Sequence, residues 1–184
     1  MRRDEYEGTK IHLPIDGLKI TKVDTGEEIP LAHTFESIAK EDDIFVYCLS
    51  TTCSGILAEK FEAKSCIEIL KPMLFIGLIQ NALNRRPSIK NKHLEYSLVK
   101  YYKPYEPPII DWALPEKIAL SKLSSFSWQN EYRLAFAVNG AFDVYNVEAK
   151  LVPLGVQRNI QASSYSERRI KLGNLSKICK IHHF

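Results

Sequence analysis

The stretch FSWQNEYRLAF, residues 126–136, places polar side chains at alternating positions among aromatic and aliphatic ones. Gln129, Glu131 and Arg133 are two residues apart, so they share one face if the segment is an extended strand. A fixed carboxylate beside an amide and a guanidinium can stabilise a positive charge that develops on a substrate. The same row is also typical of the wet face of an antiparallel strand, with a surface pair between Glu131 and Arg133. Both interpretations stay open.

The other side chains of this segment predict part of the core. If residues 128–136 are extended, Trp128 and Asn130 share the opposite face with Tyr132, Leu134 and Phe136. We therefore expect these last three side chains to be buried. The polar row would then line a surface or a cleft.

A second polar group ends an apolar run upstream, where YCLSTT closes in Ser50, Thr51 and Thr52. This hydroxyl-rich strand end and the Q-x-E spacing after a Ser-rich aromatic turn together resemble motifs of the ADP-ribosyltransferase superfamily. The resemblance implies an enzyme that uses NAD and modifies a macromolecular acceptor. Glu131 would be its catalytic glutamate, and Gln129 would help to choose the acceptor.

The same resemblance implies roles for the neighbouring residues. Ser50 and Thr51 would order the glutamate beside NAD, and Arg133 would belong to the NAD-binding group. Cleavage of the nicotinamide–ribose bond passes through an oxocarbenium-like state, which a fixed carboxylate stabilises. Phe126 or Trp128 would touch the partner from the preceding turn.

Short segments in order along the whole chain resemble a second group, of bacterial cytoplasmic domains. These segments include RRDEYEG, VYCLS, VKYYK, KLSSFSWQNEYR and LGNLSKI. The resemblance implies a bacterial origin and one domain over residues 1–184. It also predicts a truncated N-terminus, because Asp4, Glu7 and Gly8 would belong to a motif that normally follows a strand and a helix.

Composition narrows the classes of function. The chain has 184 residues, 45% of them hydrophobic and 26% charged, which suffices for one self-supporting domain. A net charge of +3 without a concentrated basic stripe predicts only weak nucleic-acid binding. The charged start and the lack of a long apolar run predict a cytoplasmic protein without a membrane partner.

The four cysteines and five histidines show no paired ligand spacing. We therefore expect reduced thiols and no metal site. Cys48 and Cys66 lie in apolar runs and are expected to be buried.

Local patterns predict most of the elements. Residues 1–34 suggest short strands joined by turns, residues 42–52 a buried strand and residues 64–70 a further strand. Residues 54–63 suggest a helix capped by Ser54, and the segment from Pro72 to Arg86 is the clearest helix, with apolar residues at 74, 75, 78, 79, 82 and 83.

The second half of the chain is predicted to be mainly extended. Residues 96–103 and 116–122 are expected to be strands, and Asn139-Gly140 predicts a hairpin between the flanking segments. The sequence therefore favours an α+β domain with a largely antiparallel sheet and one or two packed helices. The resemblance above would make this fold ADP-ribosyltransferase-like.

A second class of function is a non-catalytic module that binds a protein or a nucleic acid. Its surface would combine the cluster Tyr101, Tyr102, Tyr105 and Trp112 with Lys100 and Lys103, although the same aromatic residues also fit core packing. The acidic residues Asp4, Glu5 and Glu7 either meet Arg133 and Lys122 across a cleft or are solvated. The sequence leaves the oligomeric state open.

Overall fold

The computed structural model describes residues 6–39, 43–87, 89, 93–156 and 168–184. The strands of these residues form five small sheets, and only the two-stranded β8–β9 sheet is parallel. Two sheets have three strands, in the orders β1-β4-β11 and β5-β10-β7. The fold belongs to the α+β class, as the sequence predicts.

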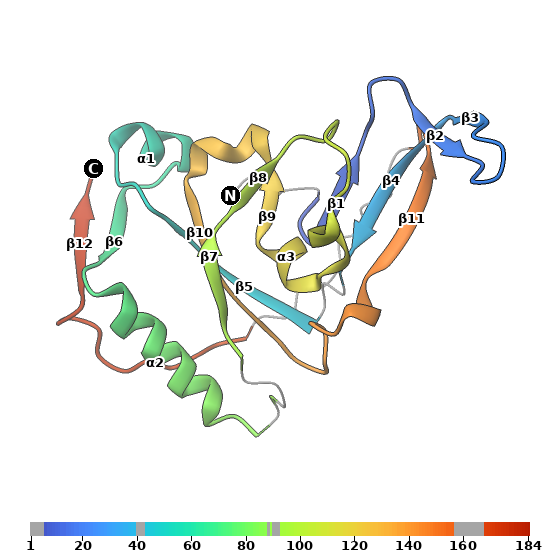
Figure 1. The fold of residues 1–184 in the computed structure, drawn as a ribbon. Helices are drawn as coiled ribbons and strands as arrows, with labels where there is room; N and C mark the ends of the chain where they lie inside the picture. Colours follow the sequence, from blue (N-terminus) through green and yellow to red (C-terminus); the bar gives the residue numbers. More distant parts are fainter. Residues whose placement is uncertain (1–5, 40–42, 88, 90–92, 157–167) are drawn as a thin grey trace.

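The sheet that carries the polar row has β10 in its middle. Its strands are β5 (Ile44–Ser50), β10 (Glu131–Ala137) and β7 (Glu95–Leu98). The second three-stranded sheet contains β1 (Thr9–His12), β4 (His33–Ile38) and β11 (Glu148–Pro153). Figure 1 shows this second sheet at the right, with α3 (Pro115–Ala119), β8 (Lys100–Tyr102) and β9 (Ser121–Leu123) between the two.

The remaining strands form two pairs at the ends of the molecule. These are β2 (Leu18–Thr21) with β3 (Glu28–Leu31), and β6 (Ser65–Ile69) with β12 (Cys179–His183). Among the described residues, three short 3-10 helices complete the elements: η2 (Ile110–Ala113), η3 (Ser124–Gln129) and η4 (Val144–Asn146).

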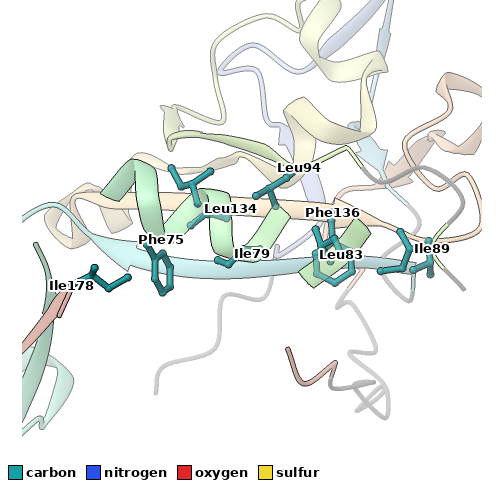
Figure 2. Packing of buried hydrophobic residues seen from close by; sticks show 10 residues of the cluster. Phe75, Ile79, Leu83, Ile89, Leu94, Leu134, Phe136 and Ile178 are labelled. Atoms are coloured by element: carbon teal, nitrogen blue, oxygen red, sulfur yellow. The ribbon is translucent and has the colours of Figure 1, made fainter. Parts of the chain in front are cut away.

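Helix α2 (Pro72–Asn84) covers one face of the sheet that contains β10. Pro72 suits the first turn of a helix, where its missing N–H has no intrahelical partner to lose. Phe75, Ile79 and Leu83 follow a spacing of four and point into the core (Figure 2). The predicted helix is confirmed, although Leu74, which was expected on the apolar face, is half exposed.

Two other local predictions are confirmed. Helix α1 (Gly55–Phe61) begins after Ser54, whose Oγ accepts a hydrogen bond from the Leu57 N–H at 3.2 Å. Strand β6 follows it, as predicted for residues 64–70.

Three local predictions are wrong, and the first two concern the extent of strands. Residues 116–122 contain α3 followed by β9, because Pro115 provides a helix start that the alternating pattern hides. Residues 96–103 form two short strands that break at Val99, where β7 ends and β8 begins.

Asn139-Gly140 forms a tight turn but no hairpin. Both residues have the positive φ angles that such a turn needs, 53° and 71°. The chain then enters η4, and the next strand, β11, pairs with β4 in the other sheet. A favourable turn therefore forms without pairing the strands on either side of it.

Candidate functional site

The polar row predicted at residues 129–133 is interrupted before β10 begins. Gln129 is the last residue of η3 and is buried. Asn130, with a left-handed φ of 44°, separates it from Glu131, the first residue of β10. The prediction that Gln129 shares a strand face with Glu131 and Arg133 is therefore wrong, because the extended conformation starts two residues later.

Within β10 the predicted alternation holds. Leu134 and Phe136 are buried against α2 (Figure 2). Tyr132 is partly buried and packs against the same cluster. Glu131 and Arg133 occupy the opposite face, but the expectation of a wet surface pair is wrong. Their side chains are only 6% and 1% exposed.

Four charged residues meet on this second face and define what we call the charged layer: Glu7, Lys122, Glu131 and Arg133. Arg133 Nε lies 3.0 Å from Glu131 Oε1, and its Nη1 lies 2.7 Å from Glu7 Oε1. Lys122 Nζ lies 3.2 Å from Glu131 Oε2. Two carboxylates and two cations thus balance, which is how buried charges persist in a protein.

The charged layer connects elements that are distant in the sequence. Arg133 Nη1 also donates to the Ala119 carbonyl at 2.6 Å, at the end of α3. The contact of Glu7 with Arg133 realises one of the two alternatives drawn from the acidic N-terminus, whereas Asp4 and Glu5 lie outside the described residues. The layer therefore holds the first turn, α3 and β9 against β10.

Electrostatics favour the ionised forms of Glu131 and Arg133. Burial alone would raise the pKa of Glu131, but Arg133, a hydrogen bond from Cys48, and Lys122 bring it below its usual value. Burial works in the opposite direction on Arg133, where Glu7 and Glu131 keep the pKa above that of a free guanidinium. These contacts favour a structural role for the Glu131 carboxylate, which holds neighbouring segments of the chain in place.

The hydroxyl residues lie near this carboxylate but contact something else. Ser50 is the register partner of Glu131. Its Oγ donates to the Gln129 carbonyl at 2.9 Å, and Thr51 Oγ1 donates to the Asn130 carbonyl at 3.2 Å. The two hydroxyls thus fix the turn that precedes β10. Their predicted part in binding NAD stays a prediction, as does the catalytic role of Glu131.

The aromatic residues that the sequence singled out divide into two groups. Tyr102 and Trp112 are buried and in contact, with ring centroids 5.5 Å apart, whereas Tyr105 is half exposed. Phe126 and Trp128, on η3, lie under the ammonium groups of Lys122 and Lys60. Core packing therefore accounts for the middle of the predicted base-stacking cluster.

A groove of about 880 Å³ lies beside β5, and we call it the β5 groove. β5 is confirmed as a strand, but its predicted burial is wrong, because it is an edge strand of its sheet. Five consecutive residues of β5 line the groove, and successive residues of a strand belong to opposite faces: Ile44, Phe45, Val46, Tyr47 and Cys48. The groove therefore follows the open edge of the strand.

The two walls of the β5 groove differ in size and chemistry. One wall is bulky and apolar and includes Phe75, Ile79 and Leu172. The other consists of small groups, from Gly8, Ala39 and Ala119, next to Glu7. Arg168 and Arg169 add positive charge, and the Arg168 guanidinium lies 5.5 Å from the centroid of the Phe45 ring.

Cys48 connects the groove with the charged layer. It was expected to be buried, but it has an exposed surface in the groove. Protein still surrounds the thiol on most sides, and this desolvation raises its pKa to about 12, with Arg133 opposing and Glu131 adding to the shift. The group is therefore a thiol at neutral pH.

Sequence reasoning missed the groove residues, since an uncharged run such as IFVYCLS fits a buried strand and an open edge equally well. Comparison with protein-family models, curated proteins and solved structures finds no match to this chain. The two resemblances therefore rest on the quoted motifs alone.

Two further findings apply to the described part of the chain. No helix there is long and apolar enough to cross a membrane. No group of three or more histidine, cysteine, aspartate or glutamate side chains there is arranged to hold a metal ion.

Proposed function

We propose that the protein binds an extended segment of a partner protein, which adds as a further strand along the open edge of β5. The observation that carries this proposal is the groove itself, which both faces of β5 line. A cavity on one face of a sheet would contact alternate residues only. A cavity that contacts consecutive residues surrounds the edge, where another strand can pair.

The main chain of β5 supports such pairing. Val138 N–H donates to the Asp43 carbonyl, and Thr51 N–H donates to the Asn130 carbonyl. Antiparallel strands alternate between bonded and non-bonded pairs, so odd-numbered residues of β5 bond to β10. The main-chain groups of Ile44, Val46 and Cys48 then point outward. Among the described strands, only β10 pairs with β5.

The walls of the groove favour a particular ligand strand. Side chains of a strand alternate between faces, so one set would meet Phe45, Tyr47 and Phe75 while the other would meet Gly8 and the small residues near it. Large apolar residues suit the first set and small residues the second. The guanidinium group of Arg168, which lines the groove, favours an acidic residue in the segment.

Strand addition combines affinity from the main chain with specificity from side-chain pockets. The test begins with a phage-displayed library of random nine-residue peptides selected on the purified protein. We expect enrichment of alternating large apolar residues with one acidic residue. A selected peptide, labelled for fluorescence anisotropy, should lose at least about tenfold in affinity when the main-chain nitrogens on its β5-facing side are methylated, because two or more hydrogen bonds disappear.

Matched proline variants localise the binding. Val46→Pro removes an outward N–H of β5 without removing a bond to β10, and Tyr96→Pro makes the same change on β7, at the other edge of the sheet. The peptide should bind Val46→Pro at least about tenfold more weakly and Tyr96→Pro unchanged. Equal binding by both variants, or no enriched sequence, would overturn the proposal.

Two further probes separate the other hypotheses. Release of nicotinamide from NAD by the wild-type protein and its loss in Glu131→Gln would support the ADP-ribosyltransferase hypothesis instead. Tight binding of an oligothymidine at physiological salt would support a nucleic-acid-binding module instead. The small net charge of the chain predicts only weak binding, which physiological salt would abolish. The Glu131 carboxylate already bonds to Lys122 and Arg133, so we expect no release of nicotinamide. We also expect no tight binding of the oligothymidine.

A further inference from the structure

Two of the four cysteines lie side by side outside the groove and the charged layer. Cys53 is exposed in the turn between β5 and α1, and Cys66 is half-buried in β6. Their sulfur atoms are 3.2 Å apart. A disulfide bond is about 2.05 Å long, so closure needs about 1 Å of movement between two surface side chains.

The setting of this pair makes such a movement easy. Cys53 precedes Ser54, the cap of α1, in an exposed turn. Cys66 is the register partner of His182, so β12 holds β6 in place. The nearby His182 Nε2 and Glu68 Oε2 bond to each other at 2.7 Å. One sulfur is thus on a firm strand and the other on a turn that can adjust.

We propose that Cys53 and Cys66 form a redox-active dithiol that a small-molecule disulfide converts into an intramolecular disulfide. This site is independent of the proposed peptide binding. It differs from the prediction of four reduced thiols, because the contact joins two of them that lie 13 positions apart.

The reaction proceeds in two exchanges. The Cys53 thiolate attacks one sulfur of the small disulfide, forms a mixed disulfide and releases one thiolate. Cys66 then loses its proton and attacks Cys53 Sγ, which forms the protein disulfide and releases the second thiolate. The protein loses two protons and two electrons, and the small disulfide gains them as two thiols.

Exposure and acidity set the order of these steps. The hydrogen bond with Cys53 raises the pKa of the Cys66 thiol, so Cys66 is the weaker nucleophile in the reduced protein. Cys53 is also the more exposed of the two. Once Cys53 carries the small thiol, that hydrogen bond is gone and Cys66 can resolve the intermediate.

The bond would join the segment after β5 to β6 and close a short loop around α1. Loops of this size gain stability from a cross-link because the unfolded chain is restricted. For a protein of this size we expect the melting temperature to rise by roughly 5–10 °C on oxidation. Dithiothreitol should reverse the shift.

The test equilibrates the full chain in buffers of reduced and oxidised glutathione, followed by acid quenching and peptide mapping without reduction. We expect a linked Cys53–Cys66 peptide in the wild-type protein and in the control variants Cys48→Ser and Cys179→Ser. Cys53→Ser and Cys66→Ser should each lack it, and Cys66→Ser should trap one glutathione on Cys53.

The map of the wild-type protein decides the proposal even if a variant folds poorly. A linked peptide that contains Cys48 or Cys179 would overturn it. So would glutathione on Cys53 of the wild-type protein with no linked peptide at any ratio of the two glutathione forms. If the melting temperature does not change when the bond forms, the proposed stabilisation by the disulfide is wrong.

Discussion

The charged layer and the β5 groove adjoin each other, but their polar groups differ: those of the layer are paired, and those beside β5 face outward. In the charged layer every charge has a partner, and Arg133 is 1% exposed. Beside β5, main-chain groups face outward between apolar walls. Glu7 belongs to both, and Cys48, which lines the groove, donates a hydrogen bond to Glu131 of the layer. The difference teaches that conspicuous polar residues can serve the fold, while an inconspicuous apolar strand can offer the proposed binding surface.

The strongest test of this contrast removes the central cation of the layer. Arg133→Met leaves two carboxylates without their shared partner, and breaking a buried pair in this way costs about 3–5 kcal/mol. Urea unfolding measures the change. Lys150→Met, on the exposed side of β11, is the matched control and should change stability by less than about 0.5 kcal/mol. A loss equal to that of the control would mean that the layer is dispensable.

The second test removes a carboxylate. A solvated pair between Glu131 and Arg133 would make Glu131→Gln cost little stability, but the buried contacts predict a loss of about 2–3 kcal/mol at neutral pH. The pKa of Glu131 is lowered in the folded protein, so its stabilisation is complete above the ordinary value of 4.5 and is lost as pH falls below it. Unfolding measured from pH 7 down to pH 3 should therefore show the two proteins converging. A constant difference would contradict this origin.

Lys10 sharpens the comparison because it is a buried cation without a carboxylate partner among the described residues. It is 2% exposed and lies 5.6 Å from the centroid of the Trp112 ring. Burial lowers the pKa of Lys10 to about 8. The charge of Asp111 opposes this shift, and the charge of Lys100 adds to it. The unfolded chain holds this proton up to the ordinary value of 10.5, so stability should rise between pH 8 and pH 10.5.

Two matched variants test this opposite sign. Lys10→Met should gain about 1–2 kcal/mol at pH 7 and lose the alkaline rise, because the buried charge is gone. Lys122→Met, which removes a buried lysine that has a partner, should lose about 1–3 kcal/mol. Unfolding of both variants across this pH range provides the measurement. Losses of similar size in both would show that partners do not decide the outcome.

The smallest effect concerns the boundary between the two regions and leaves stability unchanged. The pKa of Cys48 is about 12, so little thiolate exists at pH 8. Iodoacetamide should therefore label Cys48 about 10²–10³-fold more slowly than a cysteine of ordinary pKa. Quenched time points and peptide mapping give the rates, with added glutathione as the reference thiol. Equal rates would mean that the thiol is well solvated.

The sequence predicted elements best where a local pattern and the packing agree. The four-residue spacing of α2, the Ser54 cap and the alternation of Tyr132, Leu134 and Phe136 each depend on neighbours along the chain. The sequence offered the contact of Glu7 with Arg133 only as one of two alternatives, because the two residues lie more than a hundred positions apart, and it did not predict the burial of Arg133. The open edge of β5 and the contact of Cys53 with Cys66 depend in the same way on which strands become neighbours.

The pairing of β5 with β10 also bears on how the chain folds during synthesis. Ser50 pairs with Glu131, so β5 leaves the ribosome well before its only described partner exists. At roughly 5–20 residues per second, this wait lasts on the order of 4–16 s. During that time IFVYCLS is an uncharged strand with two open edges, a form prone to aggregation. Nascent chains that end shortly before residue 131 should therefore engage chaperones most strongly.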